Sequence, residues 1–336
     1  MDFKAFPKIE LHRHIEGSLR LGTIIELAKQ HGRPLPASTV EGLAPYAQVL
    51  RPLDSLQAVL HAFDLFQHSF LRLEAVERIA FEAVKDAAND GIRLVELRFS
   101  PDFMARPANL EWDAMMDAML RGTRRGEAET GTLVALIAIV SRSYGLKSAH
   151  ETAAFAVNWR DELAGFDLAD TEDAVPAREL ARAIQPVHAA GISLTVHSGE
   201  NSPSNHIRES VEILEARRIG HGVSLIEDDA LIELCIARNT HIEACPTSNL
   251  RTRAVPSLTQ HPARVLLERG VSLSINSDDP GLFDITLSHE FKVAAEDLGF
   301  SDADLRKASR CALEASFASE AQKATFRAAY GDQLEA

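Results

Sequence analysis

The chain has 336 residues, of which 46% are hydrophobic, and a formal net charge of −14. It is therefore long enough for one large globular domain spanning residues 1–336, and its acidic balance argues against nucleic-acid binding, which requires a basic surface. Its three scattered cysteines fit a reducing compartment, and residues 1–10 lack the apolar segment of a signal peptide. The most apolar run, residues 132–140, is too short to span a membrane. We expect a cytoplasmic protein that binds neither nucleic acid nor membranes.

Eight short apolar runs are predicted as strands, and longer helical patterns separate them. The predicted strands cover residues 8–14, 92–100, 132–141, 163–169, 192–200, 217–223, 240–248 and 270–279. Helices are predicted at residues 73–90 and 176–190, each followed by a glycine. This alternation predicts a parallel sheet, and eight such units predict a (β/α)8 TIM barrel. An open doubly wound sheet is the alternative, but no Gly-rich phosphate-binding motif follows the first strand.

The connection after the first strand, from about residue 18 to 91, is much the longest in the chain. It contains a helix-like segment at residues 21–32 and an aromatic segment at residues 56–73. We therefore expect a long helical insertion at the barrel mouth, where it would act as a lid. Residues 285–330, after the last strand, are Ala-rich and helix-like.

Polar side chains alternate with apolar ones along three predicted strands. His12 and His14 lie on one face of the first strand, and His197 and Asp278 lie on the polar faces of the fifth and eighth. In a barrel the apolar face packs against the helices, so the polar face points inward, and active sites form at the C-terminal strand ends. Three imidazoles and one carboxylate there predict a site for a divalent transition metal, best matched by one zinc ion with room for a water.

Three more polar residues are predicted at the same rim: Glu200, His221 and Asp279. Each has an ordinary explanation, since Glu200 could cap a helix, the glycines beside His221 could turn the chain, and Asp279 precedes a proline. Around a metal, however, they would supply a proton-transferring carboxylate, an imidazole that steers hydroxide, and an acceptor for substrate.

The segment HIEACP, at residues 241–246, partly matches the zinc signature of cytidine-type deaminases. The second cysteine of that signature is missing and the spacing is wrong. We therefore interpret the segment as an ordinary seventh strand, followed by a loop at residues 246–252 that lines the mouth.

Seven motifs together resemble the adenosine deaminase family. They are ELHRHIEGSL, VELRFSP, FDLAD, HSGE, RIGHGV, CPTSN and SDDP, and they span about residues 7 to 300. The resemblance implies a TIM barrel with one zinc ion that hydrolyses the 6-amino group of adenine-containing compounds. It implies that the metal ligands are His12, His14, His197 and Asp278. It also implies that Glu200 protonates the purine N1, that His221 orients the attacking hydroxide, and that Asp279 hydrogen-bonds N7.

The substrate contacts implied in this way come from His14, Glu16, Phe63, Asp170 and Asp279. Two of these positions depart from the adenosine-cleaving members of the family. Asp170 replaces a glycine whose backbone lies near the purine N3, and Glu16 replaces a shorter Asp that meets the 5′-hydroxyl. Leu60, Phe63 and Phe66 lie where the family covers its substrate, although such an aromatic stripe is equally typical of a helix core.

The sequence thus predicts a zinc aminohydrolase that converts adenosine, and 2′-deoxyadenosine, to inosine compounds and ammonia through a zinc-activated hydroxide. Adenine, or a nucleoside with a larger 5′ group such as aminodeoxyfutalosine, is the alternative substrate. A binuclear amidohydrolase is disfavoured because the fourth strand lacks the bridging lysine it requires. A non-catalytic nucleoside sensor is disfavoured because both Glu200 and His221 are present. The oligomeric state is left open.

Overall fold

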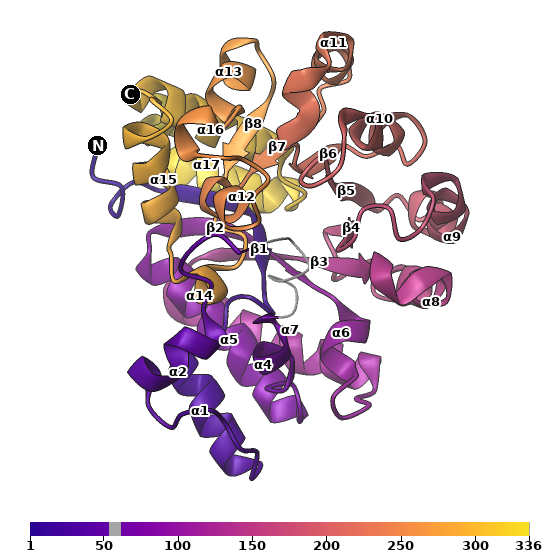
Figure 1. Cartoon of the computed structure of the whole chain (residues 1–336), viewed down its shortest axis with the longest axis vertical. Helices are drawn as coiled ribbons and strands as arrows, with labels where there is room; N and C mark the ends of the chain where they lie inside the picture. Colours follow the sequence, from indigo (N-terminus) through magenta and orange to yellow (C-terminus); the bar gives the residue numbers. More distant parts are fainter. Residues whose placement is uncertain (54–61, 336) are drawn as a thin grey trace.

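The computed structural model describes residues 1–53 and 62–335, and its central element is an eight-stranded parallel sheet (Figure 1). The strands are β1 (Lys8–His14), β2 (Ile92–Phe99), β3 (Leu133–Ser141), β4 (Gly165–Ala169), β5 (Ser193–Ser198), β6 (Arg218–His221), β7 (His241–Ala244) and β8 (Leu273–Ile275). They pair in chain order from β1 to β8. Each predicted strand is therefore present, although all but β1 are shorter than predicted.

Backbone hydrogen bonds between the first and last strands close the sheet. The Asp278 N–H, just beyond β8, donates to the His12 carbonyl at 2.9 Å, and the His14 N–H donates to the Asp278 carbonyl at 3.0 Å. Closure of eight parallel strands confirms the predicted TIM barrel. The bonds that close the barrel thus involve three of the predicted metal ligands.

In the described part of the chain, a main helix follows each strand and lies outside the barrel (Figure 1). These helices are α5 (Leu73–Asn89), α7 (Trp112–Thr130), α8 (Gly145–Asn158), α9 (Ala177–Ala189), α10 (Ser204–Glu212), α11 (Asp229–Ala237), α13 (Ala263–Glu268) and α16 (Asp302–Ala315). The helices predicted at residues 73–90 and 176–190 correspond to α5 and α9. Shorter or later helices are α6 (Pro101–Ala105), α12 (Pro246–Arg251), α14 (Pro280–Phe283), α15 (Leu287–Glu296) and α17 (Glu320–Glu335). Within residues 1–53 and 62–335, every helix is too short or too polar to cross a lipid bilayer.

The predicted insertion between β1 and α5 is helical where it is described. It contains α1 (Leu21–Gln30), α2 (Val40–Ala47) and α4 (Asp64–Gln67), which gather below β1 in Figure 1. Leu60 lies outside the described residues. Phe66 is fully buried in the hydrophobic core, whereas Phe63 is half-buried and lines a cavity at the barrel mouth. The aromatic stripe therefore contributes Phe66 to the core and Phe63 to the wall of that cavity.

The two faces of the strands differ as predicted. Alternate residues such as Ile9 and Leu194 belong to the hydrophobic core. The other face is polar, since Arg98 on β2 reaches Asp167 on β4 and Glu243 on β7, each at 2.8 Å. These three side chains are fully buried. The barrel interior is therefore an ion-pair network that lies directly beneath the mouth.

Candidate active site

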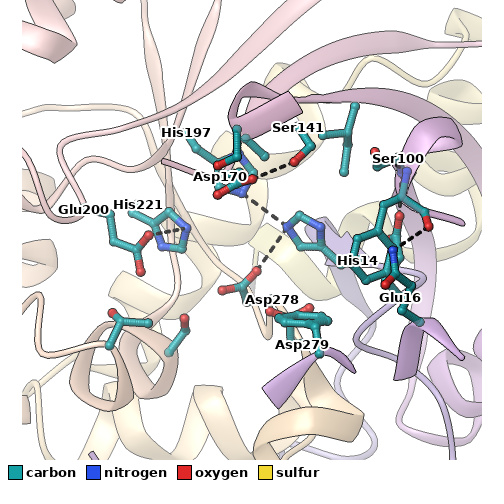
Figure 2. Close-up of a pocket in the computed structure, with 18 of the residues that line it drawn as sticks. His14, Glu16, Ser100, Ser141, Asp170, His197, Glu200, His221, Asp278 and Asp279 are labelled. Carbon is teal, nitrogen blue, oxygen red and sulfur yellow. Dashed lines mark hydrogen bonds and ion pairs between the residues drawn. The ribbon is translucent and has the colours of Figure 1, made fainter. Parts of the chain in front are cut away.

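The four predicted metal ligands lie together at the mouth of the barrel. His14 Nε2 lies 3.2 Å from His197 Nε2 and 3.3 Å from Asp278 Oδ1 (Figure 2). His12 Nε2 lies 3.3 Å from the same carboxylate oxygen. One ligand atom from each of the four residues falls within 4.8 Å of the others. The fold thus brings together residues from β1, β5 and the end of β8, which are far apart in the sequence.

Carboxylates in the barrel interior orient two of the imidazoles. His12 Nδ1 lies 2.7 Å from Glu243 Oε2, and His197 Nδ1 lies 3.1 Å from Asp167. Arg98 pairs with both of these carboxylates. The pKa of Glu243 and that of Asp167 lie well below their usual values, because the cationic neighbours outweigh the effect of burial. Each imidazole can therefore donate its Nδ1–H to an ionised carboxylate, which leaves its Nε2 as the atom that faces the mouth.

This donor set fits a divalent metal. Burial lowers the pKa of His197 to about 4 and that of His14 well below its usual value, so both rings are neutral at pH 7. Burial alone would raise the pKa of Asp278, but the imidazoles around it hold that pKa well below its usual range. The buried His12 Nε2 makes no hydrogen bond within the described residues. Three imidazole nitrogens and one carboxylate oxygen are ligands that zinc accepts readily.

A second group of possible ligands overlaps the first. His221, Cys245 and Asp278 also offer atoms within 4.8 Å of one another. Burial and the nearby Asp278 raise the pKa of Cys245 well above its usual value, so its thiol stays protonated and is a poor metal ligand. The set of three histidines and Asp278 is therefore the better metal site.

Glu200 and His221 face each other beside the metal ligands (Figure 2). Glu200 Oε2 lies 3.7 Å from His221 Nε2, and both side chains are buried. His261 Nε2 lies 3.0 Å from Asn249 Oδ1, and Asn249 Nδ2 lies 3.0 Å from His221 Nδ1. An amide held this way donates to His221 Nδ1, which leaves the Nε2–H of His221 directed toward Glu200. Burial raises the pKa of Glu200, although His221 opposes the shift. Glu200 is thus better able to hold a proton than an exposed carboxylate, as a general acid must.

Asp279 and Glu16 are two further buried acids at the mouth. Burial and the adjacent Asp278 charge raise the pKa of Asp279 well above its usual value, so its carboxyl is protonated. Burial raises the pKa of Glu16 to about 7. Glu16 Oε1 accepts the Ser100 backbone N–H at 2.5 Å, while Glu16 Oε2 and Asp279 Oδ1 have no hydrogen-bond partner within the described residues. Both carboxyl groups therefore have oxygen atoms available to a ligand.

Asp170 also borders the mouth, but its carboxylate is already engaged. Asp170 accepts from the Ser141 hydroxyl at 2.6 Å and from the Thr171 backbone N–H at 2.6 Å. Its backbone is left-handed, with φ of 72°. The Asp170 side chain thus lines the mouth at the position where the resemblance leads one to expect a glycine.

A cavity of about 330 Å³ joins these groups. Its apolar wall includes Phe63, Phe103, Ile139, Tyr144 and Phe283. Its acidic groups are Glu16, Asp64, Asp170, Glu200, Asp278 and Asp279. None of its described lining residues is Lys or Arg. The combination of an apolar wall with a few convergent polar groups is typical of a pocket for a small organic molecule.

Sequence reasoning placed every candidate site residue at the mouth but missed the residues beneath them. The predicted seventh strand is present, but the segment predicted as a loop after it is mostly the helix α12. Ser248 in α12 and Thr252 just after it line the cavity, as expected of this segment. Glu243 within that strand also orients His12, which was not predicted. The available signal was strand alternation: Glu243 follows Ile242 and so points to the opposite, inward face. The same signal was available for Asp167 in the fourth strand.

Comparisons with known proteins agree with this geometry. The sequence model described as adenosine deaminase matches residues 7–329. The adenosine deaminase of Shewanella loihica is 37% identical over 97% of this chain and 98% of its own length. The solved structure of adenine deaminase from Arthrobacter aurescens matches over 99% of this chain and 100% of its own length, with 27% identity and a TM-score of 0.91. A zinc-bound amidohydrolase from Burkholderia ambifaria matches over 99% of this chain and 92% of its own length, with 26% identity and a TM-score of 0.89. The chain belongs to the adenosine deaminase family.

Proposed function

We propose that this protein catalyses the hydrolytic deamination of adenosine, and of 2′-deoxyadenosine, to the corresponding inosine compound and ammonia. The observation that carries the proposal is the placement of a protonatable Glu200 and an oriented His221 beside four convergent metal ligands. The adenosine deaminase of Shewanella loihica, 37% identical over nearly the whole chain, supports this substrate.

One zinc ion per chain would be held by His12, His14, His197 and Asp278. When bound, zinc lowers the pKa of a water molecule to about 7 and so supplies a nucleophile at neutral pH. The zinc-bound relative from Burkholderia ambifaria supports the choice of metal.

Four side chains would transfer the proton, orient the nucleophile and bind the substrate. Glu200, whose pKa is raised by burial, donates a proton to the purine N1, which makes C6 more electrophilic. His221 orients the attacking oxygen, because Asn249 fixes its tautomer and ring plane. Asp279, held protonated, donates its O–H to the purine N7, which is an acceptor. Glu16 Oε2 accepts a hydrogen bond from a sugar hydroxyl.

The charge of the cavity favours an uncharged nucleoside over a nucleotide. A 5′-phosphate would be desolvated among carboxylates, without a Lys or Arg from the described lining residues to pair with it. Adenine is the second candidate substrate, because the Arthrobacter aurescens adenine deaminase shares the fold with a TM-score of 0.91. A 5′-extended nucleoside is a third, since Glu16 and Asp170 border the sugar end of the cavity.

The test is ultraviolet absorbance of purified, zinc-loaded protein incubated with adenosine, 2′-deoxyadenosine, adenine and 5′-extended adenosines. Loss of the 6-amino chromophore with adenosine is expected, and Glu200→Gln should lower kcat by a factor of about 100 or more while retaining zinc and fold. Turnover of adenine alone, or of a 5′-extended nucleoside alone, would overturn the substrate assignment. Absence of turnover across the panel would refute the catalytic proposal.

A further inference from the structure

Glu172 lies just after β4, and the mechanism above does not use it. Its carboxylate accepts hydrogen bonds from three successive backbone N–H groups of the loop after β5: Gly199 at 2.7 Å, Glu200 at 2.9 Å and Asn201 at 3.2 Å. The Ser202 hydroxyl also donates to it. Burial would raise the pKa of Glu172, but the Arg142 charge and the hydrogen bonds from Ser202, Gly199 and Asn201 hold it below its usual value. The carboxylate is therefore ionised and saturated by the loop that carries Glu200.

The loop around Glu200 is constrained from its other side as well. Gly199 has φ of 70°, and a Cβ atom there would lie 2.4 Å from Ile207 Cδ1 and 2.6 Å from Ser224 Oγ. The chain can therefore follow this path only with a glycine at position 199. Successive N–H groups in such a turn form a concave anion site, which the Glu172 carboxylate fills from within the same chain.

Arg142 connects the backbone near Glu172 to the backbone of the metal ligand His197. Its buried guanidinium donates to the carbonyls of Ala169 at 3.1 Å, Asp170 at 3.0 Å and His197 at 2.9 Å. The ends of β4 and β5 are thereby joined. Arg142 Nη1 also lies 3.5 Å from the Glu172 carbonyl oxygen, so this side chain bridges the backbone of Glu172 to that of His197.

We propose that Glu172 is a positioning residue that holds the backbone of Glu200, so that the Glu200 carboxyl reaches both His221 and the purine N1. This inference rests on the proposed function, because it assigns to Glu200 the proton transfer. Glu172 makes no contact with the cavity that holds substrate and acts only through the loop. In Figure 2, the Glu200 carboxyl points at the neighbouring His221 ring.

The kinetic test is a double-mutant cycle between Glu172→Gln and Glu200→Gln in zinc-loaded enzyme. A glutamine at position 172 keeps the size of the side chain but turns an amide NH2 toward the loop donors. We expect kcat to fall about 10- to 100-fold with KM changed less than about twofold, because small displacements of a catalytic group have effects of that size. In the Glu200→Gln background the same change should lower kcat less than about twofold. An equal loss in both backgrounds would overturn the proposal.

Hydrogen exchange tests the same contact without using activity. In zinc-loaded, substrate-free protein, Glu172→Gln should speed amide exchange at residues 199–201 by at least about tenfold. The exchange rates of the β strands should not change. Asp173→Asn is the matched control, since Asp173 is the next residue and is exposed; it should leave exchange and kcat unaltered. Unchanged exchange in Glu172→Gln would refute the positioning role.

The two proposals fail in different ways. If the wild-type protein turns over no substrate, the proposed function is wrong, while the exchange experiment still decides whether Glu172 holds the loop. If Glu172→Gln does not fold, Glu172→Asp replaces it in both experiments, with an expected three- to tenfold loss of kcat because the charge remains but the reach is shorter. Wild-type kcat and exchange in that variant would refute the inference.

Discussion

Replacing Asp167 by Asn should weaken metal binding without changing any residue at the mouth. Asp167 lies beneath the site on β4, where it accepts from His197 Nδ1 at 3.1 Å and pairs with Arg98 at 2.8 Å. An asparagine preserves the shape but removes the charge that both partners require. The His197 ring would then be held less firmly and its Nε2 would be less basic.

The size of the effect follows from these contacts. Loss of such a supporting carboxylate lowers metal affinity about 10- to 100-fold, which corresponds to about 1.4–2.7 kcal/mol. We expect the upper half of this range, because Arg98 also loses one of its two ionised partners in a fully buried position. The affinity is measured by zinc competition with a chromogenic chelator on metal-free protein, with thermal unfolding as the check on folding.

Asp161→Asn is the control for this experiment. Asp161 precedes the same strand, and its side chain is 88% exposed, so its zinc affinity should match the wild type. A folded Asp167→Asn protein with zinc affinity within about twofold of the wild type would show that Asp167 does not support His197. The assignment of the interior ion pairs to the metal site would then be wrong.

Three other predictions address different parts of the molecule. Gly17→Ala would place a Cβ atom 1.8 Å from Asp279 Oδ1, so displacement of that carboxyl should raise KM for adenosine about three- to tenfold with zinc content unchanged, as steady-state kinetics and metal analysis will show. Adenosine 5′-monophosphate should be deaminated with kcat/KM at least about 100-fold below adenosine, and comparable values would contradict the charge argument. Burial raises the pKa of Glu290 to about 8, so its contribution to stability is full below about pH 4.5 and is lost as the pH rises through about 8. The free energy of unfolding in urea should therefore fall between about pH 5 and 8 more steeply for the wild type than for Glu290→Gln. The difference in slope should be at most about 1.4 kcal/mol per pH unit, and equal slopes would refute the prediction.

The strands and the mouth could be predicted from the sequence because both depend on local periodicity. Strand side chains alternate with a period of two, so His12 and His14 had to share a face, and the polar phase of β5 and β8 identified His197 and Asp278. Barrel topology then brought these strand ends together whatever the details of packing. The helical segment at residues 21–32 was also local in origin and became α1.

The network beneath the mouth could not be predicted, because its pairs join distant parts of the chain. Arg98 and Asp167 are 69 residues apart, and Arg98 and Glu243 are 145 apart. Charged residues in a sequence normally indicate solvent, and only the closed barrel shows that these three compensate one another in its interior. Glu172 was hidden for the same reason, since an acid in a loop resembles a solvated one until its three backbone donors are seen.

The backbone conformation of three residues at the mouth departs from the one that their residue types prefer. Asp170, His221 and Asp278 lie at or just after the ends of β4, β6 and β8 with φ of 72°, 65° and 62°. A left-handed conformation costs a residue other than glycine about 1–2 kcal/mol, so glycine would be the lower-energy choice at each position. Glycine, however, could supply neither the carboxylate that accepts from Ser141, nor the imidazole that faces Glu200, nor the carboxylate of the candidate metal site. The left-handed turn aims each side chain into the mouth, and the hydrogen-bonded strands on either side hold it there. The fold is therefore less stable at these three positions than it would be with glycine, and in return three functional side chains converge at the mouth.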